Sequence, residues 1–511
     1  MQALESYLGG RWAGGRGAAH TLVNPATEAP LATASSEGLD LAAALEFARA
    51  RGGPALRALS FAERGALLKA MAEALQEARD ELLALGIANC GNTRSDAKFD
   101  VDGAIGTLLA YAELGESLGA ARFLLDGEGL QLGRSPRFHG QHVAVPRHGV
   151  AVHVNAFNFP AWGLCEKAAP ALLAGMPVLS KPATATAMLA ERAMRAVVEA
   201  KVLPEGALQL LVGAPRDLPA RLGAQDVLAF TGSGATGERL RALPNVVRHA
   251  VRVNVEADSL NAALLGPEVE PRSDMYELFL KDVVRDMTQK AGQKCTAIRR
   301  VLVPQALLEA VREDLVELLG AVKLGDPADE DVRMGPLTSE AQLGEVLEGA
   351  QRLGAESRQV AGGARRALER GYFFAPALFE YGLGAEANAA HEREVFGPVA
   401  CLLPHDGDPS QIVARGQGGL VCSIYSEDAA WLERTVAQVA PWHGRLFLGH
   451  PKIELSPGPG TVLPQLVHGG PGRAGGGEEL GGRRALNFYL QRVALEGSRP
   501  VLAALAKGAA A

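Results

Sequence analysis

The chain has 511 residues, of which 48% are hydrophobic and 21% are charged, and its formal net charge is −7. A chain of this length is too long for one small core, so we expect a globular protein of two or three domains without a nucleic-acid surface. Its first ten residues lack the features of a secretory signal, and the apolar run 168–179 is too short to span a membrane.

Short apolar runs alternate with helical patterns over residues 149–261. The runs predict strands, and the patterns between them predict helices. The expected strands are 149–156, 176–180, 207–212 and 226–230, and the expected helices are 162–173 and 188–202. Such alternation is typical of a parallel sheet with helices on both faces. Cofactor sites in these sheets lie at the carboxyl ends of the strands.

A second alternating block runs from about residue 261 to residue 447 and contains a long helical pattern at 275–290. The two blocks predict an α/β fold with two doubly wound parallel-sheet domains. We expect residues 1–255 to form the first domain and 256–447 the second. Residues 448–511 are expected to return to the first domain.

Five cysteines occur at wide spacings, and none forms a CxxC pair. An odd number without paired spacing argues against a disulfide framework and a zinc site, and it favours a reducing cytoplasm. A lone cysteine is ordinarily a buried, inert core residue. Cys90, Cys165, Cys401 and Cys422 keep that interpretation, whereas the surroundings of Cys295 argue for a reactive thiol.

Three motifs carry groups suited to chemistry. They are NAFNFP at 155–160, FTGS at 230–233 and AGQKCTA at 291–297. They offer a side-chain amide, a phosphate cradle and a thiol nucleophile. Their order and spacing resemble the aldehyde dehydrogenase superfamily over nearly the whole chain. The resemblance implies that residues 1–255 bind a nicotinamide cofactor and that residues 256–447 form the catalytic domain.

The resemblance also implies catalytic roles. Cys295 would add to an aldehyde, and the amide of Asn158 with the backbone N–H of Cys295 would stabilise the oxyanion. The alternative for Asn158 is a turn-forming asparagine. Glu256 would activate water to hydrolyse the thioester, with Asp258 as a rival base because the family's ELGG motif is not intact here. Lys167 matches a family lysine that would serve as a proton relay or as structural support.

The run GSGATG at 232–237 satisfies the GxGxxG pattern of a dinucleotide fingerprint. In that interpretation Glu256 would bind a ribose. The stretch instead resembles the family motif FTGSxxxG, which includes Gly232, Ser233 and Gly237. Ser233 and the following helix N-terminus would then meet the cofactor pyrophosphate, which leaves Glu256 free for catalysis.

The resemblance assigns Lys181 to the adenine ribose. Many NAD-preferring members place a glutamate three residues later, where this chain has Thr184. We therefore expect NADP to be accepted and preferred, with NAD as a second cofactor. The further cofactor contacts that the resemblance implies are Phe157, Gly213, Glu394 and Phe396.

Two strand-like segments, 122–146 and 487–495, lie outside both blocks. The resemblance implies a small β arm that pairs with a second subunit, and the alternative is an edge hairpin on one domain. The segment 468–482 (HGGPGRAGGGEELGG) is dense in glycine, which predicts a loop too flexible to pack. We interpret it as a mobile loop near the active site, with a plain surface loop as the alternative.

Together the motifs predict a hydrolytic, metal-independent aldehyde dehydrogenase. The segments NAFNFP, NVEADSLN and HGGPGRAGGGEELGG most resemble a subgroup that oxidises semialdehydes carried on coenzyme A in aromatic degradation. The expected substrate is therefore a CoA-linked small-molecule aldehyde. The alternatives are an oxidase of free aliphatic or aromatic aldehydes and a non-catalytic cofactor-binding homologue. The resemblance further implies a homodimer or a dimer of dimers. The net charge and the short apolar run argue against a nucleic-acid or membrane partner.

Overall fold

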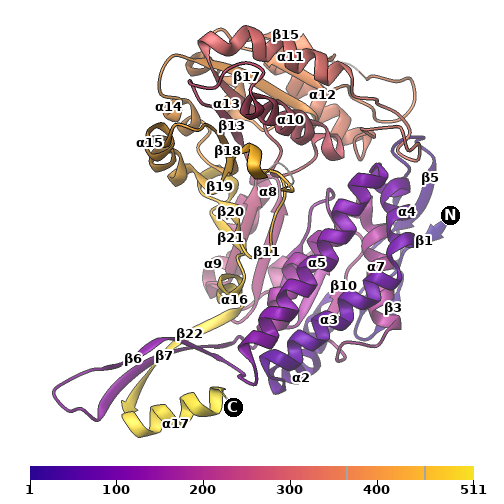
Figure 1. Ribbon diagram of the computed structural model, residues 1–511. Helices are drawn as coiled ribbons and strands as arrows, with labels where there is room; N and C mark the ends of the chain where they lie inside the picture. Colours follow the sequence, from indigo (N-terminus) through magenta and orange to yellow (C-terminus); the bar gives the residue numbers. More distant parts are fainter. Residues whose placement is uncertain (364–365, 454–455, 511) are drawn as a thin grey trace.

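Figure 1 shows two α/β lobes and a narrow arm that projects from one of them. The computed structural model describes residues 1–363, 366–453 and 456–510. Two seven-stranded sheets organise the fold, in agreement with the two alternating blocks of the sequence and with the fold that the resemblance to aldehyde dehydrogenases implies. Among the described residues, no helix is long and apolar enough to cross a lipid bilayer.

The first sheet has the strand order β12-β11-β8-β9-β10-β2-β3. Its strands are β2 (Ser6–Leu8), β3 (Arg11–Ala13), β8 (Ala151–Val154), β9 (Val178–Lys181), β10 (Leu208–Leu210), β11 (Val227–Gly232) and β12 (Arg252–Ala257). The strands from β12 to β10 are parallel, and the antiparallel β2 and β3 close one edge. β12 spans the domain limit expected at residue 255.

Helices surround this sheet and supply the largest apolar core of the chain. They include α1 (Leu41–Phe47), α2 (Gly53–Ala58), α3 (Phe61–Glu77), α4 (Arg79–Cys90), α5 (Arg94–Leu118), α6 (Pro160–Leu173), α7 (Ala187–Glu199), α8 (Gly234–Arg241) and α9 (Pro244–His249). α6 is buried along nearly its whole length because it packs against both α5 and the sheet. A smaller sheet, β1 (Gln2–Ala3), β5 (Pro30–Ala34) and β4 (His20–Val23), flanks this lobe.

The second sheet has the order β15-β16-β17-β14-β13-β18-β19. Its strands are β13 (Ala262–Leu265), β14 (Arg300–Pro304), β15 (Arg358–Ala361), β16 (Ala377–Glu380), β17 (Val399–His405), β18 (Gly419–Tyr425) and β19 (His443–Gly449). All are parallel except the edge strand β15. The surrounding helices are α10 (Asp274–Thr288), α11 (Leu308–Gly320), α12 (Glu340–Gly354), α13 (Ala389–Glu392), α14 (Ser410–Ala414) and α15 (Ala429–Val439).

The expected helix 275–290 ends two residues early, at Thr288. Lys290 and Ala291 follow with φ of 54° and 52°, in the left-handed region that non-glycine residues seldom adopt. This reversal ends α10 and directs the chain toward Cys295. The strain is local to the segment that presents the thiol.

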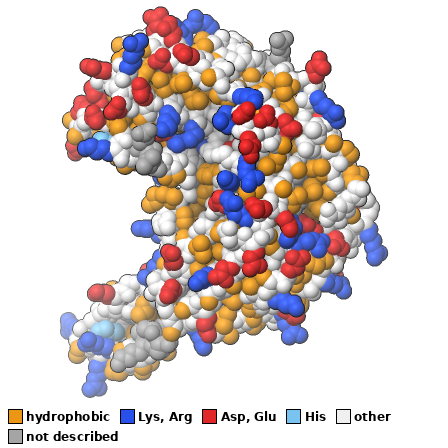
Figure 2. Space-filling view, turned by 45° about the vertical axis from the view of Figure 1, so that its right-hand side comes forward, with side chains coloured by type: hydrophobic (Ala, Val, Ile, Leu, Met, Phe, Trp, Pro, Cys, Tyr) orange, Lys and Arg blue, Asp and Glu red, His pale blue; other side chains and the backbone are white. Residues whose placement is uncertain are grey.

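The arm is an antiparallel sheet of order β22-β7-β6, formed by β6 (Leu124–Gln131), β7 (Phe138–Pro146) and β22 (Leu490–Ser498). β22 begins at Leu490 rather than at residue 487, because Asn487–Tyr489 complete α16 (Arg483–Tyr489). The last helix, α17 (Arg499–Ala510), follows the arm. In Figure 2 the arm stands apart from the body of the molecule, across a concave face from the other lobe.

The glycine-rich segment 468–482 is not the mobile loop expected from its composition. It forms the hairpin β20 (Val467–Gly470) and β21 (Gly477–Leu480). A Cβ atom at Gly475 would stand 2.1 Å from the carbonyl oxygen of Val255, and one at Gly444 would stand 1.8 Å from the carbonyl oxygen of Gly469. The glycines therefore permit backbones to pack directly on one another, which holds the hairpin against β12 and β19.

Candidate active site

A pocket between the two sheets collects side chains from distant parts of the chain. Its polar lining residues include Asn158, Glu166, Lys167, Glu256, Cys295 and His468. They come from the β8–α6 loop, from α6, from β12, from the segment after α10 and from β20. The structure thus places the three residues expected to be catalytic, Asn158, Glu256 and Cys295, in one pocket. Lys167 lies beside them.

The backbone around Cys295 is held by two buried side chains. The amide of Asn261 donates to the carbonyl oxygens of Cys295 (2.7 Å) and Ala297 (2.9 Å). The guanidinium of Arg299 donates to the carbonyl oxygens of Gly292 (2.9 Å) and Lys294 (3.2 Å). These bonds hold the backbone on both sides of Cys295 in place, which helps to position the nucleophile.

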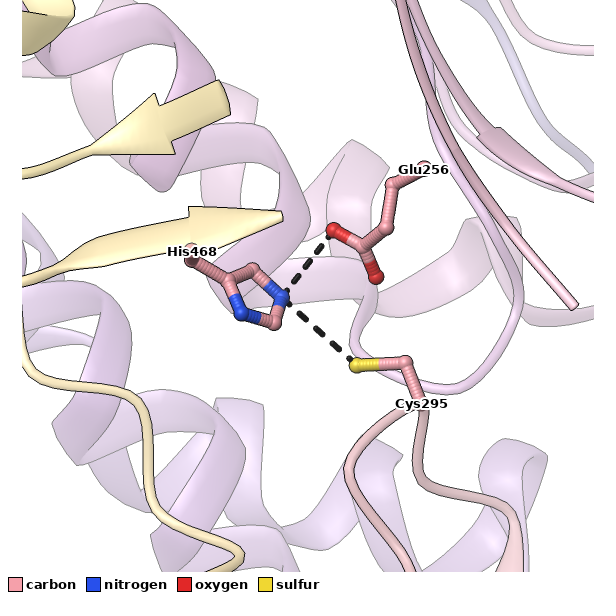
Figure 3. A group of neighbouring side chains, drawn as sticks. All are labelled: Glu256, Cys295 and His468. Carbon is pink, nitrogen blue, oxygen red and sulfur yellow. Dashed lines mark hydrogen bonds and ion pairs between the residues drawn. The ribbon is translucent and has the colours of Figure 1, made fainter. Parts of the chain in front are cut away.

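The Cys295 thiol faces a histidine that sequence reasoning did not assign to the site. His468 Nε2 lies 3.7 Å from Cys295 Sγ and 3.0 Å from Glu256 Oε2. Figure 3 shows this one nitrogen pointing toward both side chains. His468 and Glu256 are buried. A carboxylate oxygen of Glu256, the sulfur of Cys295 and a ring nitrogen of His468 lie within 4.8 Å of one another. The charge on each group therefore depends on the other two.

Burial alone would raise the pKa of Glu256, but the charge and hydrogen bond of His468, with the charge of Lys167, lower it to about 2. Burial alone would lower the pKa of His468, but the Glu256 carboxylate outweighs burial and raises it. Burial and the Glu256 charge both raise the pKa of the Cys295 thiol. The structure thus favours an anionic glutamate, a basic histidine and a thiol that resists ionisation unaided.

A second charged group lies beside the thiol. Lys167 Nζ is 2.9 Å from Glu166 Oε1 and 3.1 Å from Glu479 Oε2. Burial opposes the charge on Lys167, yet Glu166 and Glu479 raise its pKa. Burial raises the pKa of Glu479 to about 7 against the attraction of Lys167, and Asn254 Nδ2 donates to the same carboxylate at 2.9 Å.

Sequence reasoning missed Glu479 and Glu166 as well as His468. Glu479 and His468 were visible only as polar residues in a glycine-rich segment, where composition indicated a loop. Glu166 was visible as the neighbour of Lys167. Asp258 is not part of the pocket around Cys295. A Cβ atom at Gly234 would stand 2.5 Å from Asp258 Oδ2, so this carboxylate faces the start of α8 instead.

A groove on the first lobe brings together Phe157, Thr184, Gly213 and Arg216. Gly213 has φ of +105°, and a Cβ atom there would meet the backbone nitrogen of Ser36 at 2.8 Å. Glycine is therefore required at this point of the groove wall. Lys181 ends β9, and burial lowers the pKa of its ammonium to about 8.

Ser233 precedes the first turn of α8, and its hydroxyl lies 3.1 Å from that of Thr236. Gly237 packs against Val255, since a Cβ atom would stand 2.7 Å from a Val255 methyl carbon. Gly232 ends β11. The N-terminus of α8 thus lies at the carboxyl end of a parallel strand, where anions bind.

Glu394 and Phe396 lie next to Arg299. Glu394 Oε1 is 3.0 Å from the Arg299 guanidinium, and burial raises the pKa of this carboxyl to about 7 against the attraction of Arg299. The rings of Phe396 and Phe157 meet edge to face, with centroids 5.7 Å apart. Two residues expected at the cofactor, one from each lobe, are therefore in contact. The groove, Gly213 and the start of α8 fit an extended dinucleotide.

Comparison with known proteins identifies the family of the chain. The family model "Aldehyde dehydrogenase family" matches residues 12–494. The chain is 46% identical to the 3,4-dehydroadipyl-CoA semialdehyde dehydrogenase of Aromatoleum evansii, over 92% of this chain and 93% of that protein. It is 27% identical to the lactaldehyde dehydrogenase of Escherichia coli, over 95% and 96% of the two chains.

Solved structures show the same fold. The crystal structure of lactaldehyde dehydrogenase from Escherichia coli superposes with a TM-score of 0.85 at 24% identity, and 97% of this chain and 99% of that chain are covered. An NAD+ complex of aldehyde dehydrogenase from Bacillus cereus gives 0.84 at 23% identity, with 98% and 97% covered. Members of this family use NAD or NADP to oxidise aldehydes. The chain belongs to the aldehyde dehydrogenase family and is an aldehyde-oxidising enzyme.

Proposed function

We propose that this enzyme oxidises a coenzyme A-linked semialdehyde, 3,4-dehydroadipyl-CoA semialdehyde, to the carboxylic acid, with NADP as the preferred oxidant. The observation that carries the proposal is the 46% identity to the Aromatoleum evansii enzyme over nearly the whole of both chains. The same chain shares 27% identity with a lactaldehyde dehydrogenase. Because of this second similarity, the test below compares a CoA-linked semialdehyde with a free aldehyde as substrate.

In this proposal the Cys295 thiolate adds to the aldehyde carbon. Asn158 and the backbone N–H of Cys295 stabilise the oxyanion that forms. The nicotinamide, when bound, supplies the hydride acceptor. Glu256 then takes a proton from the water that attacks the Cys295 thioester, and the acid leaves as Sγ departs. The position of Glu256 in the pocket of Cys295 favours it over Asp258, which faces α8.

Lys167 fits structural support better than a proton relay. Its ammonium is held between the carboxylates of Glu166 and Glu479, which raise its pKa. A lysine with a raised pKa does not release a proton near neutral pH. Its fixed positive charge instead helps to lower the pKa of Glu256.

The preference for NADP rests on the groove that contains Thr184. A hydroxyl can hydrogen-bond a 2′-phosphate, whereas a carboxylate at that position would repel it. Arg216 adds a guanidinium to the same groove, where its Nη1 donates to the carbonyl oxygens of Ser36 (3.1 Å) and Leu39 (3.0 Å). The exposed Glu37 is the opposing charge there. Arg216, held by these two hydrogen bonds, is positioned to offset the negative charge of Glu37.

A second groove offers a place for the coenzyme A portion. It runs beside α5 and is lined by Tyr111, Pro464, Arg483 and Arg484. The stretch 460–465 connects it to the catalytic pocket, because Gly460 and Val462 line that pocket while Pro464 and Gln465 line this groove. Arg483 is bonded to the arm through the carbonyl oxygen of Leu125 at 2.7 Å, and Arg484 is exposed. Cationic groups of this kind bind the phosphates of coenzyme A.

The test compares NADPH formation from a CoA-linked semialdehyde and from the same semialdehyde without coenzyme A. We expect a higher kcat/KM for the CoA-linked compound, and Arg484→Ala should remove most of the difference by raising KM. Arg51→Ala, an exposed arginine outside the groove, serves as the matched control. Equal kcat/KM for the two compounds would overturn the CoA-linked assignment and favour a dehydrogenase of free aldehydes.

A further inference from the structure

We propose that His468 accepts the thiol proton of Cys295, so that the nucleophile of the resting enzyme is a thiolate–imidazolium pair. The proposal rests on the proposed role of Cys295 as the nucleophile. Its geometric basis is the shared nitrogen: Nε2 lies 3.7 Å from Cys295 Sγ while it bonds Glu256 Oε2 at 3.0 Å. A sulfur–nitrogen distance of this size is within the range of a thiol hydrogen bond.

The site needs such an acceptor, because the thiol is in an environment that disfavours its anion. Burial and the charge of Glu256 both raise the pKa of Cys295. A carboxylate beside a thiol repels the thiolate, so Glu256 cannot be the group that stabilises it. A cation in contact with Sγ reverses this effect, and the imidazolium of His468 is the group placed to supply it.

The charges around His468 favour its protonated form. Glu256 faces it from β12, Glu479 from β21 and Glu166 from α6, and Lys167 on α6 is the opposing cation. Burial lowers the pKa of His468, but the three carboxylates outweigh burial and raise it. The carboxylates thus make His468 a stronger proton acceptor than a buried histidine without them.

The protons and electrons balance through the cycle. The Cys295 proton moves to the unprotonated Nε2 of His468, whose N–H then donates to Glu256 Oε2, and an Sγ lone pair forms the bond to the aldehyde carbon. That carbon then loses its hydrogen as a hydride, with two electrons, for which the oxidised nicotinamide cofactor would be the acceptor. When water later cleaves the thioester, the carbon–sulfur bond breaks with its electron pair on Sγ, so the thiolate is regenerated beside an imidazolium that still holds its proton. The water proton goes to Glu256, which releases it to solvent before the next cycle, and the acid proton also goes to solvent. His468 and Glu256 therefore serve different protons.

The test uses alkylation of Cys295 by iodoacetamide, without aldehyde or cofactor, as a function of pH. Cys295→Ala gives the background from the other cysteines, which are all buried. His468→Gln removes the proton acceptor and keeps a polar side chain. We expect its alkylation midpoint to move upward by at least about one pH unit, which slows the reaction at pH 7 by about tenfold.

His443→Gln is the matched control, because His443 is a buried histidine on β19 of the second seven-stranded sheet. Its Nδ1 lies 3.0 Å from the Val439 carbonyl oxygen. It should leave the midpoint unchanged. The ultraviolet absorbance of the thiolate, taken as the difference from Cys295→Ala, gives a second measurement at each pH. If folded His468→Gln keeps the wild-type midpoint in both measurements, the proposal is overturned, even where turnover falls. Neither measurement depends on which aldehyde the enzyme oxidises.

Discussion

Replacement of Glu256 by glutamine separates the two halves of the proposed reaction. The amide keeps the size of the side chain but removes the carboxylate. Oε2 of this carboxylate lies 3.0 Å from His468 Nε2, and Glu256 lines the same pocket as Cys295. A positioned general base contributes about 10²–10⁴-fold to the step it assists. At about 1.4 kcal/mol for each tenfold change, the barrier to thioester hydrolysis should rise by about 3–6 kcal/mol.

Hydride transfer precedes the step that needs this base, so the first turnover should survive the change. In a stopped-flow experiment, Glu256→Gln should release about one NADPH per active site and then proceed about 10²–10⁴-fold more slowly than the wild type. Mass spectrometry of the stalled enzyme should find an acyl group on the peptide that contains Cys295.

Asp258→Asn is the matched control, because Asp258 was the rival base and faces the start of α8. In Asp258→Asn, NADPH formation should continue after the first turnover without a stall, so its steady-state rate should keep the wild-type ratio to its first-turnover rate. A stall in Asp258→Asn but not in Glu256→Gln would refute the assignment of the base. Loss of NADP affinity in Glu256→Gln, with hydrolysis intact, would instead revive the ribose-binding interpretation of Glu256.

Three further outcomes are expected. Thr184→Glu should lower kcat/KM for NADP far more than for NAD, since like charges in contact cost several kcal/mol; equal losses would mean that Thr184 does not face the 2′-phosphate. Burial lowers the pKa of Lys181 to about 8, so the positive charge of this side chain is lost as pH rises through that value. The Kd for NADP should therefore increase between about pH 7 and pH 9 in the wild type but not in Lys181→Met. Among the strands that the structure describes, β22 pairs with β7 alone, and Val493 on it is 39% exposed, so the arm should pair with a second subunit. Sedimentation showing only the 53.4 kDa monomer would contradict this.

The sequence by itself determined the features that are encoded locally. Alternating apolar runs predicted the parallel strands from β8 to β11, because side-chain periodicity and strand length are properties of short segments. The motif around Cys295 marked the thiol for the same reason. Resemblance then placed Asn158, Glu256 and Cys295 in one site, and the structure brings them into one pocket.

Only the tertiary structure decided which distant side chains complete that pocket. His468 is 173 positions from Cys295, and its segment has the composition of a flexible loop. The segment is instead a hairpin, because its glycines let the backbone lie against β12 and β19 at distances that a Cβ atom would forbid. No local pattern encodes such a contact, since it depends on how β20 and β21 dock on two strands of different sheets. The docking carries His468 to the thiol and Glu479 to Lys167, and so decides the charges around Cys295.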